Sequence, residues 1–78
     1  MLGDCNVKLK EYEDKKIMQA YKELQVLSDT GEMPADAFFR ELVKERQRIY
    51  NTEYNMDATK ADVMAEIARR WYEMQRVE

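Results

Sequence analysis

Apolar side chains recur at helical spacing in three separate stretches of this chain. At about 100° per residue, intervals of three and four residues place them on one face of each stretch. The stretches cover residues 14–28, 34–51 and 57–75. Only 2 glycines and 1 proline occur in the chain, whereas all-β folds need many such residues for their turns. The sequence therefore predicts an all-α fold, a small three-helix bundle.

The chain is long enough for one small domain. A chain of 78 residues buries only about 60% of the surface that its unfolded form exposes, so its stability margin is narrow. We expect residues 1–78 to form a single helical domain, with residues 1–13 as an N-terminal arm or a helical extension. Val7 to Lys10 alternate like a strand, but a lone strand would have no partner here.

Residues typical of helix ends separate the three predicted helices. Asp14 is a candidate N-cap for the first helix. Gly31 suits the position just after its end, and Pro34 suits the first turn of the second helix. Asp57 and Thr59 are the candidate caps of the third helix.

The third predicted helix has an apolar arc that spans roughly half of its circumference. An arc this wide can face two neighbours at once. Ala61, Ala65 and Ala68 form a flank of small residues that would permit close approach of another helix. The arc fits the core of a three-helix bundle, and it also fits a homodimer, because association would relieve a small core.

A charge interrupts the apolar face of the second predicted helix. Phe39 and Leu42 lie at the centre of that face, and Arg46 projects from its middle. The guanidinium either packs over the edge of the core and pairs with an acid from another helix, or it anchors a binding partner. Arginine and aromatic residues are enriched in protein interfaces, and Tyr50 lies beside Arg46. Both interpretations are open at this point.

The second predicted helix also carries a basic ridge, which consists of Arg40, Lys44 and Arg48 at intervals of four residues. Like charges at this spacing mildly destabilise a helix, so we expect a solvated face in which glutamates pair with them. The other interpretation is docking onto an acidic partner. The full set of candidate protein-binding residues is Arg46, Tyr50, Tyr54, Arg40, Lys44, Arg48, Trp71 and Tyr72.

The composition does not favour catalytic or metal chemistry. The chain has no histidine, which removes Ser-His and Cys-His pairs and most metal sites. Oxygen-bearing residues between 51 and 62 have the spacing of a calcium loop, but Met56 stands where the loop needs glycine. Helix capping explains several of these residues without a metal. We expect no enzyme activity, no cofactor and no metal site.

The charge distribution argues against binding to nucleic acid. The net charge is −3, and all arginines lie in the second half of the chain. In the third predicted helix, Asp62, Glu66 and Glu73 share a polar face with arginines and would repel a phosphate backbone. A DNA-binding regulator similar to a helix-turn-helix protein therefore ranks below a protein-binding function.

Two features predict the cellular compartment. With Cys5 as the single cysteine, no disulfide can form within the chain. Residues 1–4 show no apolar signal region, and no stretch approaches the ~18 apolar residues of a membrane span. We expect a soluble, cytoplasmic protein with no membrane contact.

Taken together, these features favour a small, acidic, non-catalytic protein that binds another protein stoichiometrically. It would act as an adaptor, a subunit or an inhibitor of host machinery of the type found in phages and mobile elements, an analogy of size and class alone. The alternatives are a homodimeric structural or assembly protein and a DNA-binding regulator. The sequence does not identify the partner.

Overall fold

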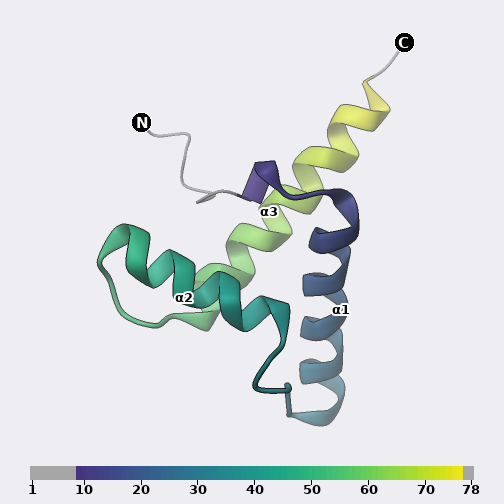
Figure 1. Cartoon of the computed structure of the whole chain (residues 1–78). Helices are drawn as coiled ribbons and strands as arrows, with labels where there is room; N and C mark the ends of the chain where they lie inside the picture. Colours follow the sequence, from purple (N-terminus) through teal and green to yellow (C-terminus); the bar gives the residue numbers. More distant parts are fainter. Residues whose placement is uncertain (1–8, 77–78) are drawn as a thin grey trace.

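The computed structural model describes residues 9–76, which form a three-helix bundle preceded by a short arm (Figure 1). In the arm, a 3-10 turn, η2, covers Leu9–Glu11. Helix α1 covers Asp14–Thr30, α2 covers Phe38–Tyr50 and α3 covers Met56–Gln75. The described part of the chain contains no strand, so the predicted all-α class is confirmed. None of its helices is long and apolar enough to cross a membrane.

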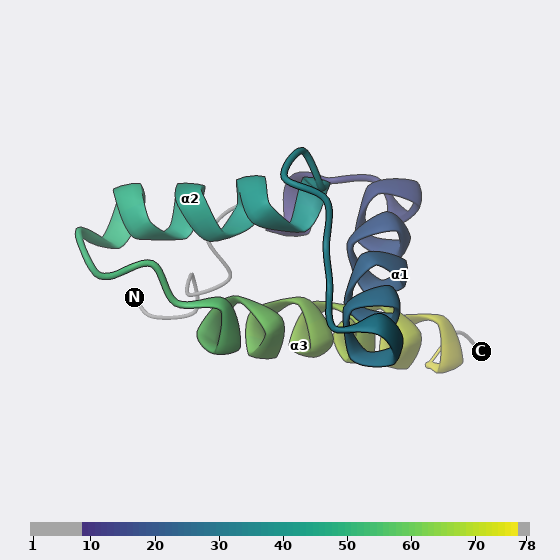
Figure 2. The ribbon, with the colours of Figure 1, turned by 90° about the horizontal axis from the view of Figure 1, so that it is seen from below.

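The core lies where the three helices and the arm meet. Its fully buried apolar side chains come from every helix and include Ile17, Phe39, Val43 and Val63. Leu9 of η2 is buried among them and closes the core from the arm. Figure 1 shows that α2 crosses the first half of α3 at a steep angle, and Figure 2 shows that α1 spans from the level of α2 to that of α3. The C-terminal end of α3 projects beyond the other two helices (Figure 1).

Left-handed residues end the first two helices. Gly31 has a φ of 80°, and its N–H donates to the carbonyl of Leu27 at 2.7 Å. Asn51 ends α2 with a φ of 53°, and its N–H donates to the carbonyl of Gln47. Glycine takes this conformation without steric cost, and asparagine tolerates it better than most residues. The prediction that Gly31 follows the end of the first helix is confirmed.

The helix starts differ from the predicted ones. Asn55 is the N-cap of α3, and its Oδ1 accepts the N–H of Ala58 at 2.9 Å. Thr59 lies inside the helix, where its side chain is buried and its hydroxyl donates to the carbonyl of Asn55. Glu13 is the N-cap of α1. The predicted caps Asp14, Asp57 and Thr59 are therefore wrong, because several capping residue types stand close together and the tertiary path of the chain selects among them.

A residue from another helix caps the start of α2. Pro34 lies in the connecting segment, so α2 begins four residues later than predicted, after Ala37. Alanine has no side-chain acceptor, and Glu23 of α1 supplies one instead. Its carboxylate accepts the N–H of Phe38 at 3.1 Å and that of Phe39 at 2.7 Å. A carboxylate at this position satisfies two free amides and favours the positive end of the helix.

Replacing Glu23 with alanine is expected to lower the free energy of unfolding by about 1–2 kcal/mol, the usual cost of losing a helix cap. The first amides of α2 would lose their acceptor in a partly buried position. Urea denaturation followed by circular dichroism measures this loss. Lys22→Ala changes an exposed neighbour on α1 and is the matched control. Equal losses for the two variants would show that Glu23 does not stabilise α2.

Candidate functional site

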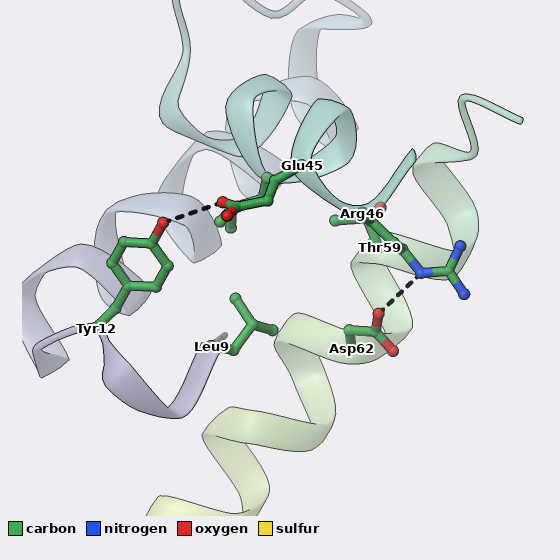
Figure 3. Close-up of a pocket in the computed structure, with 7 residues that line it drawn as sticks. Leu9, Tyr12, Glu45, Arg46, Thr59 and Asp62 are labelled. Atoms are coloured by element: carbon green, nitrogen blue, oxygen red, sulfur yellow. Dashed lines mark hydrogen bonds and ion pairs between the residues drawn. The ribbon is translucent and has the colours of Figure 1, made fainter. Parts of the chain in front are cut away.

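A small pocket opens between η2, α2 and α3 (Figure 3). It is lined by Leu9, Tyr12, Leu42, Glu45, Arg46, Thr59 and Asp62. The cavity measures about 10 Å³, which is room for about one water molecule. The pocket is therefore too small to hold an organic ligand, and its polar residues serve the structure around it.

Arg46 lies at this pocket and is paired within the chain. Its Nε donates to Oδ2 of Asp62 on α3 at 3.1 Å, as Figure 3 shows, and its guanidinium lies 5.3 Å from the ring centre of Tyr50. Its side chain is 24% exposed. Burial raises the pKa of Asp62, although the hydrogen bond and charge of Arg46 oppose the increase. The structure thus contains the ion pair that was one of the two sequence interpretations.

An interface role for Arg46 stays a prediction. A partner would have to compete with Asp62 for the guanidinium.

Two residues of the predicted calcium-loop pattern have other roles in the structure. Asp62, at the last ligand position of that pattern, is bound to Arg46, and Asn55 caps α3. Within residues 9–76, no group of three or more acidic or sulfur side chains is arranged to hold a metal ion.

A buried carboxylate holds the arm against α3. Glu66 is 0% exposed, and its Oε2 accepts from Arg69 at 2.7 Å and from Arg70 at 2.6 Å. Burial alone would raise the pKa of Glu66, but the hydrogen bonds and charges of the two arginines outweigh burial and hold the pKa below its usual value. Glu66 is therefore ionised at neutral pH and orients both guanidinium groups.

Arg70 extends this cluster to the arm and to the first residue of α1. Its Nη1 binds Oδ1 of Asp14 at 2.6 Å, and its Nη2 donates to the carbonyls of Leu9 and Tyr12. Tyr12 in turn donates its hydroxyl to Glu45 of α2 at 3.4 Å (Figure 3). Burial and the Glu45 charge raise the pKa of this tyrosine. The described part of the arm is thus bound to both α2 and α3 and forms part of the fold.

Only one edge of the predicted apolar arc of α3 faces the core, where Val63 is buried and Ile67 packs against the buried residues. Thr59, Val63 and Glu66 are its buried residues. Ala61, Ala65 and Ala68, which were expected to permit close approach of another helix, are exposed. Glu66 is buried although its position in the sequence predicts a polar face. A signal was present, because Glu66 has an arginine both three and four residues later, but such pairs are also common on helix surfaces.

This orientation leaves an apolar surface on the outer side of α3. We call it the outer face of α3, and it consists of Ala61, Met64, Ala65, Ala68, Trp71 and Tyr72, all of which are exposed. Trp71 and Tyr72 are 61% and 60% exposed and lie at the projecting end of the helix. At 100° per residue, the six residues share one side of α3, opposite to the buried side.

A groove borders the outer face. It lies between the start of α1 and the end of α3, has a volume of about 190 Å³ and is mainly apolar. Met18 and Met74, both exposed, line it together with Trp71. The outer face and this groove form a continuous apolar surface at the end of the molecule that the core does not use.

The remaining predicted binding residues lie elsewhere. Arg40 donates to the carbonyls of Pro34 and Met33 and so closes the segment before α2. Arg48 pairs with Glu45 at 3.4 Å, and Lys44 is exposed on the same helix. Tyr50 and Tyr54 are each 40% exposed at the end of α2 and in the following connection.

The eight predicted residues therefore do not form one surface. Trp71 lies nine residues after Asp62, the partner of Arg46, which is about 14 Å along α3. The structure brings Trp71 and Tyr72 together with Met64 and the three alanines on one exposed side of α3. Comparisons with known proteins add no relative: no family model matches the chain, and neither a curated protein nor a solved structure gives a significant match.

Proposed function

We propose that this chain is a non-catalytic module that binds another protein through the outer face of α3. The observation that supports the proposal is the adjacent pair Trp71 and Tyr72, each about three-fifths exposed at a projecting helix end. Exposed apolar patches of this kind mark interaction sites on soluble proteins. Tryptophan, tyrosine and methionine are also the residues that interfaces favour most.

The size of the two side chains makes them effective contact residues. A large aromatic side chain covers about 150–250 Å² when fully buried, so Trp71 and Tyr72 together offer on the order of 200 Å² of surface to a partner. Truncating a buried aromatic contact at an interface commonly costs about 2 kcal/mol or more. The chain would act stoichiometrically, as an adaptor, a subunit or an inhibitor.

The same geometry favours a protein partner over DNA. Arg69 and Arg70, the adjacent arginines of α3, are both bound to the carboxylate of Glu66. Phosphate contacts would require these charges to be available, and the outer face itself carries no basic side chain. The single cysteine, Cys5, lies outside the described residues; it favours a reducing compartment, so the proposal places this interaction in the cytoplasm.

A photo-crosslinking competition tests the proposal. The full chain carries p-benzoylphenylalanine in place of Gln75, an exposed residue beside the outer face, and is irradiated in an extract of the organism that encodes it. Excess unlabelled wild-type chain is expected to suppress the covalent protein adduct. The Trp71→Ala/Tyr72→Ala chain is expected to compete at least tenfold less well, as a loss of 2 kcal/mol implies.

Two controls complete this experiment. The label at Gln25, an exposed position on α1, should give no adduct that the wild-type chain suppresses. The double variant should keep the melting temperature of the wild type, because both aromatic side chains are more than half exposed. Equal competition by the double variant and the wild type would refute a binding role for the outer face.

A further inference from the structure

We infer that the partner of the outer face is a second copy of this chain, bound so that the two α3 helices run antiparallel about a two-fold axis. The inference rests on the proposed function and names the partner for the same surface. Figure 2 shows that α2 lies on one side of α3 and that no described helix covers the opposite side. A second α3 can therefore approach without displacing any part of the described fold.

The outer face is self-complementary in size. Its N-terminal half has the small residues Ala61 and Ala65, and its C-terminal half has the bulky residues Trp71 and Tyr72. An antiparallel arrangement centred between Ala65 and Ala68 places the aromatic half of each helix over the alanine half of the other. A parallel arrangement would place bulky residues against each other and leave a gap between the alanines. Close packing of large against small side chains favours the antiparallel form.

The charges at the two ends of the face follow the same symmetry. Asp57 lies in the first turn of α3, and Arg76 lies just after its last turn. The antiparallel arrangement brings Asp57 of each copy near the partner's Arg76, which pairs opposite charges at both ends of the contact. It also opposes the two helix dipoles, which is the favourable orientation for neighbouring helices.

The available area is sufficient for a weak but specific dimer. The two aromatic residues, Met64 and the three alanines of the outer face expose roughly 500 Å² per copy, within the usual range for the largest patch of a small protein. Specific interfaces bury about 600–1,000 Å² per partner, so the outer face alone falls below this range and a weak dimer needs its polar rim as well. We therefore expect a dissociation constant on the order of micromolar.

The solution mass of the purified full chain tests this inference. Light scattering after size exclusion is expected to show a mass that rises toward about 18.8 kDa, twice the 9.4 kDa of one chain, between 1 μM and 1 mM. Ala65→Arg places two charges at the centre of the contact and is expected to raise the dissociation constant at least 100-fold. Gln25→Arg adds the same charge at an exposed position on α1 and should leave the dimer unchanged.

The results separate this inference from the proposed function. A wild-type chain that stays monomeric at 1 mM overturns the second copy as partner, and the proposed function then stands or fails on whether the Gln75 label still gives a specific adduct with a different protein. A dimer that persists in Ala65→Arg overturns the outer face as the contact. Circular dichroism of Ala65→Arg should match the wild type, because Ala65 is exposed and arginine is a good helix former.

Disulfide trapping tests the orientation. In a Cys5→Ser background, one chain carries Ala61→Cys and another carries Tyr72→Cys. In the antiparallel dimer each engineered cysteine faces the other type, while two copies of the same cysteine lie about 16 Å apart, beyond the reach of a disulfide. Mixed chains should therefore form a heterodisulfide that neither chain forms alone. Efficient disulfides between two copies of the same variant would overturn the antiparallel arrangement.

Discussion

Replacing Glu66 with alanine is expected to lower the free energy of unfolding by about 3–5 kcal/mol, because the change removes one side of a buried ion pair. Arg70, which is only 18% exposed at its side chain, would lose the more deeply buried of its two carboxylate partners. Arg69 would lose its shortest ion pair as well. A domain of this length is stabilised by about 4–12 kcal/mol in total, so the substitution would remove a large share of its stability.

Urea denaturation at neutral pH measures this effect. Glu73→Ala is the matched control, since Glu73 lies on the same helix and pairs with arginines at 3.4 and 3.9 Å, but its side chain is 50% exposed. An exposed pair of this type contributes about 0–1 kcal/mol. Glu66→Gln keeps one acceptor oxygen and should lie between the two variants. A loss for Glu66→Ala no larger than that for Glu73→Ala would show that the cluster does not hold the arm.

Replacing Phe39 with alanine is expected to cost about 3–5 kcal/mol, the range for removing a buried phenylalanine. Phe39 is fully buried in the core where the helices meet, and its amide is held by Glu23 of α1. The alanine side chain would leave a cavity that the neighbouring helices cannot fill without moving. The backbone hydrogen bond to Glu23 would persist, so the loss would report packing alone.

Thermal and urea denaturation of Phe39→Ala measure this loss. Ile49→Ala on the same helix is the control, because Ile49 is 39% exposed and its removal leaves no closed cavity. Its expected cost is about 1 kcal/mol or less. If the two variants lost equal stability, the packing of α1, α2 and α3 around Phe39 would have to differ from the structure.

The position of Trp71 and Tyr72 changes which part of the chain is the strongest candidate for binding. In the sequence, Arg46 was the conspicuous residue because a charge on an apolar face is unusual. In the structure Arg46 is paired with Asp62, while the two aromatic residues are left exposed on α3. A charge on an apolar face is therefore a weak guide to an interface when an acid on a neighbouring helix is able to neutralise it.

Several local features were predictable from the sequence because their causes lie within a few residues. The three helices follow from apolar periodicity, and the end of α1 follows from Gly31, whose left-handed conformation is accessible at that point to few other residues. The buried positions Phe39 and Leu42 on α2 also follow from periodicity. These features depend on the chain near them and need no knowledge of the other helices.

The sequence by itself determined the all-α class, the three helices and the central residues of the α2 core face. The tertiary structure decided the start of α2, through the carboxylate of Glu23, and the rotation of α3. The wide apolar arc of α3 permitted more than one side to face inward. The Glu66 cluster determines which side of α3 faces inward. Glu66 binds Arg69 and Arg70, and Arg70 also binds the arm. The buried carboxylate is stable only when all of these groups meet. Arg70 contacts Asp14 and Leu9, which lie more than 50 positions away in the sequence, and such contacts have no local sequence pattern. These contacts fix the rotation of α3 that leaves Trp71 and Tyr72 on the surface.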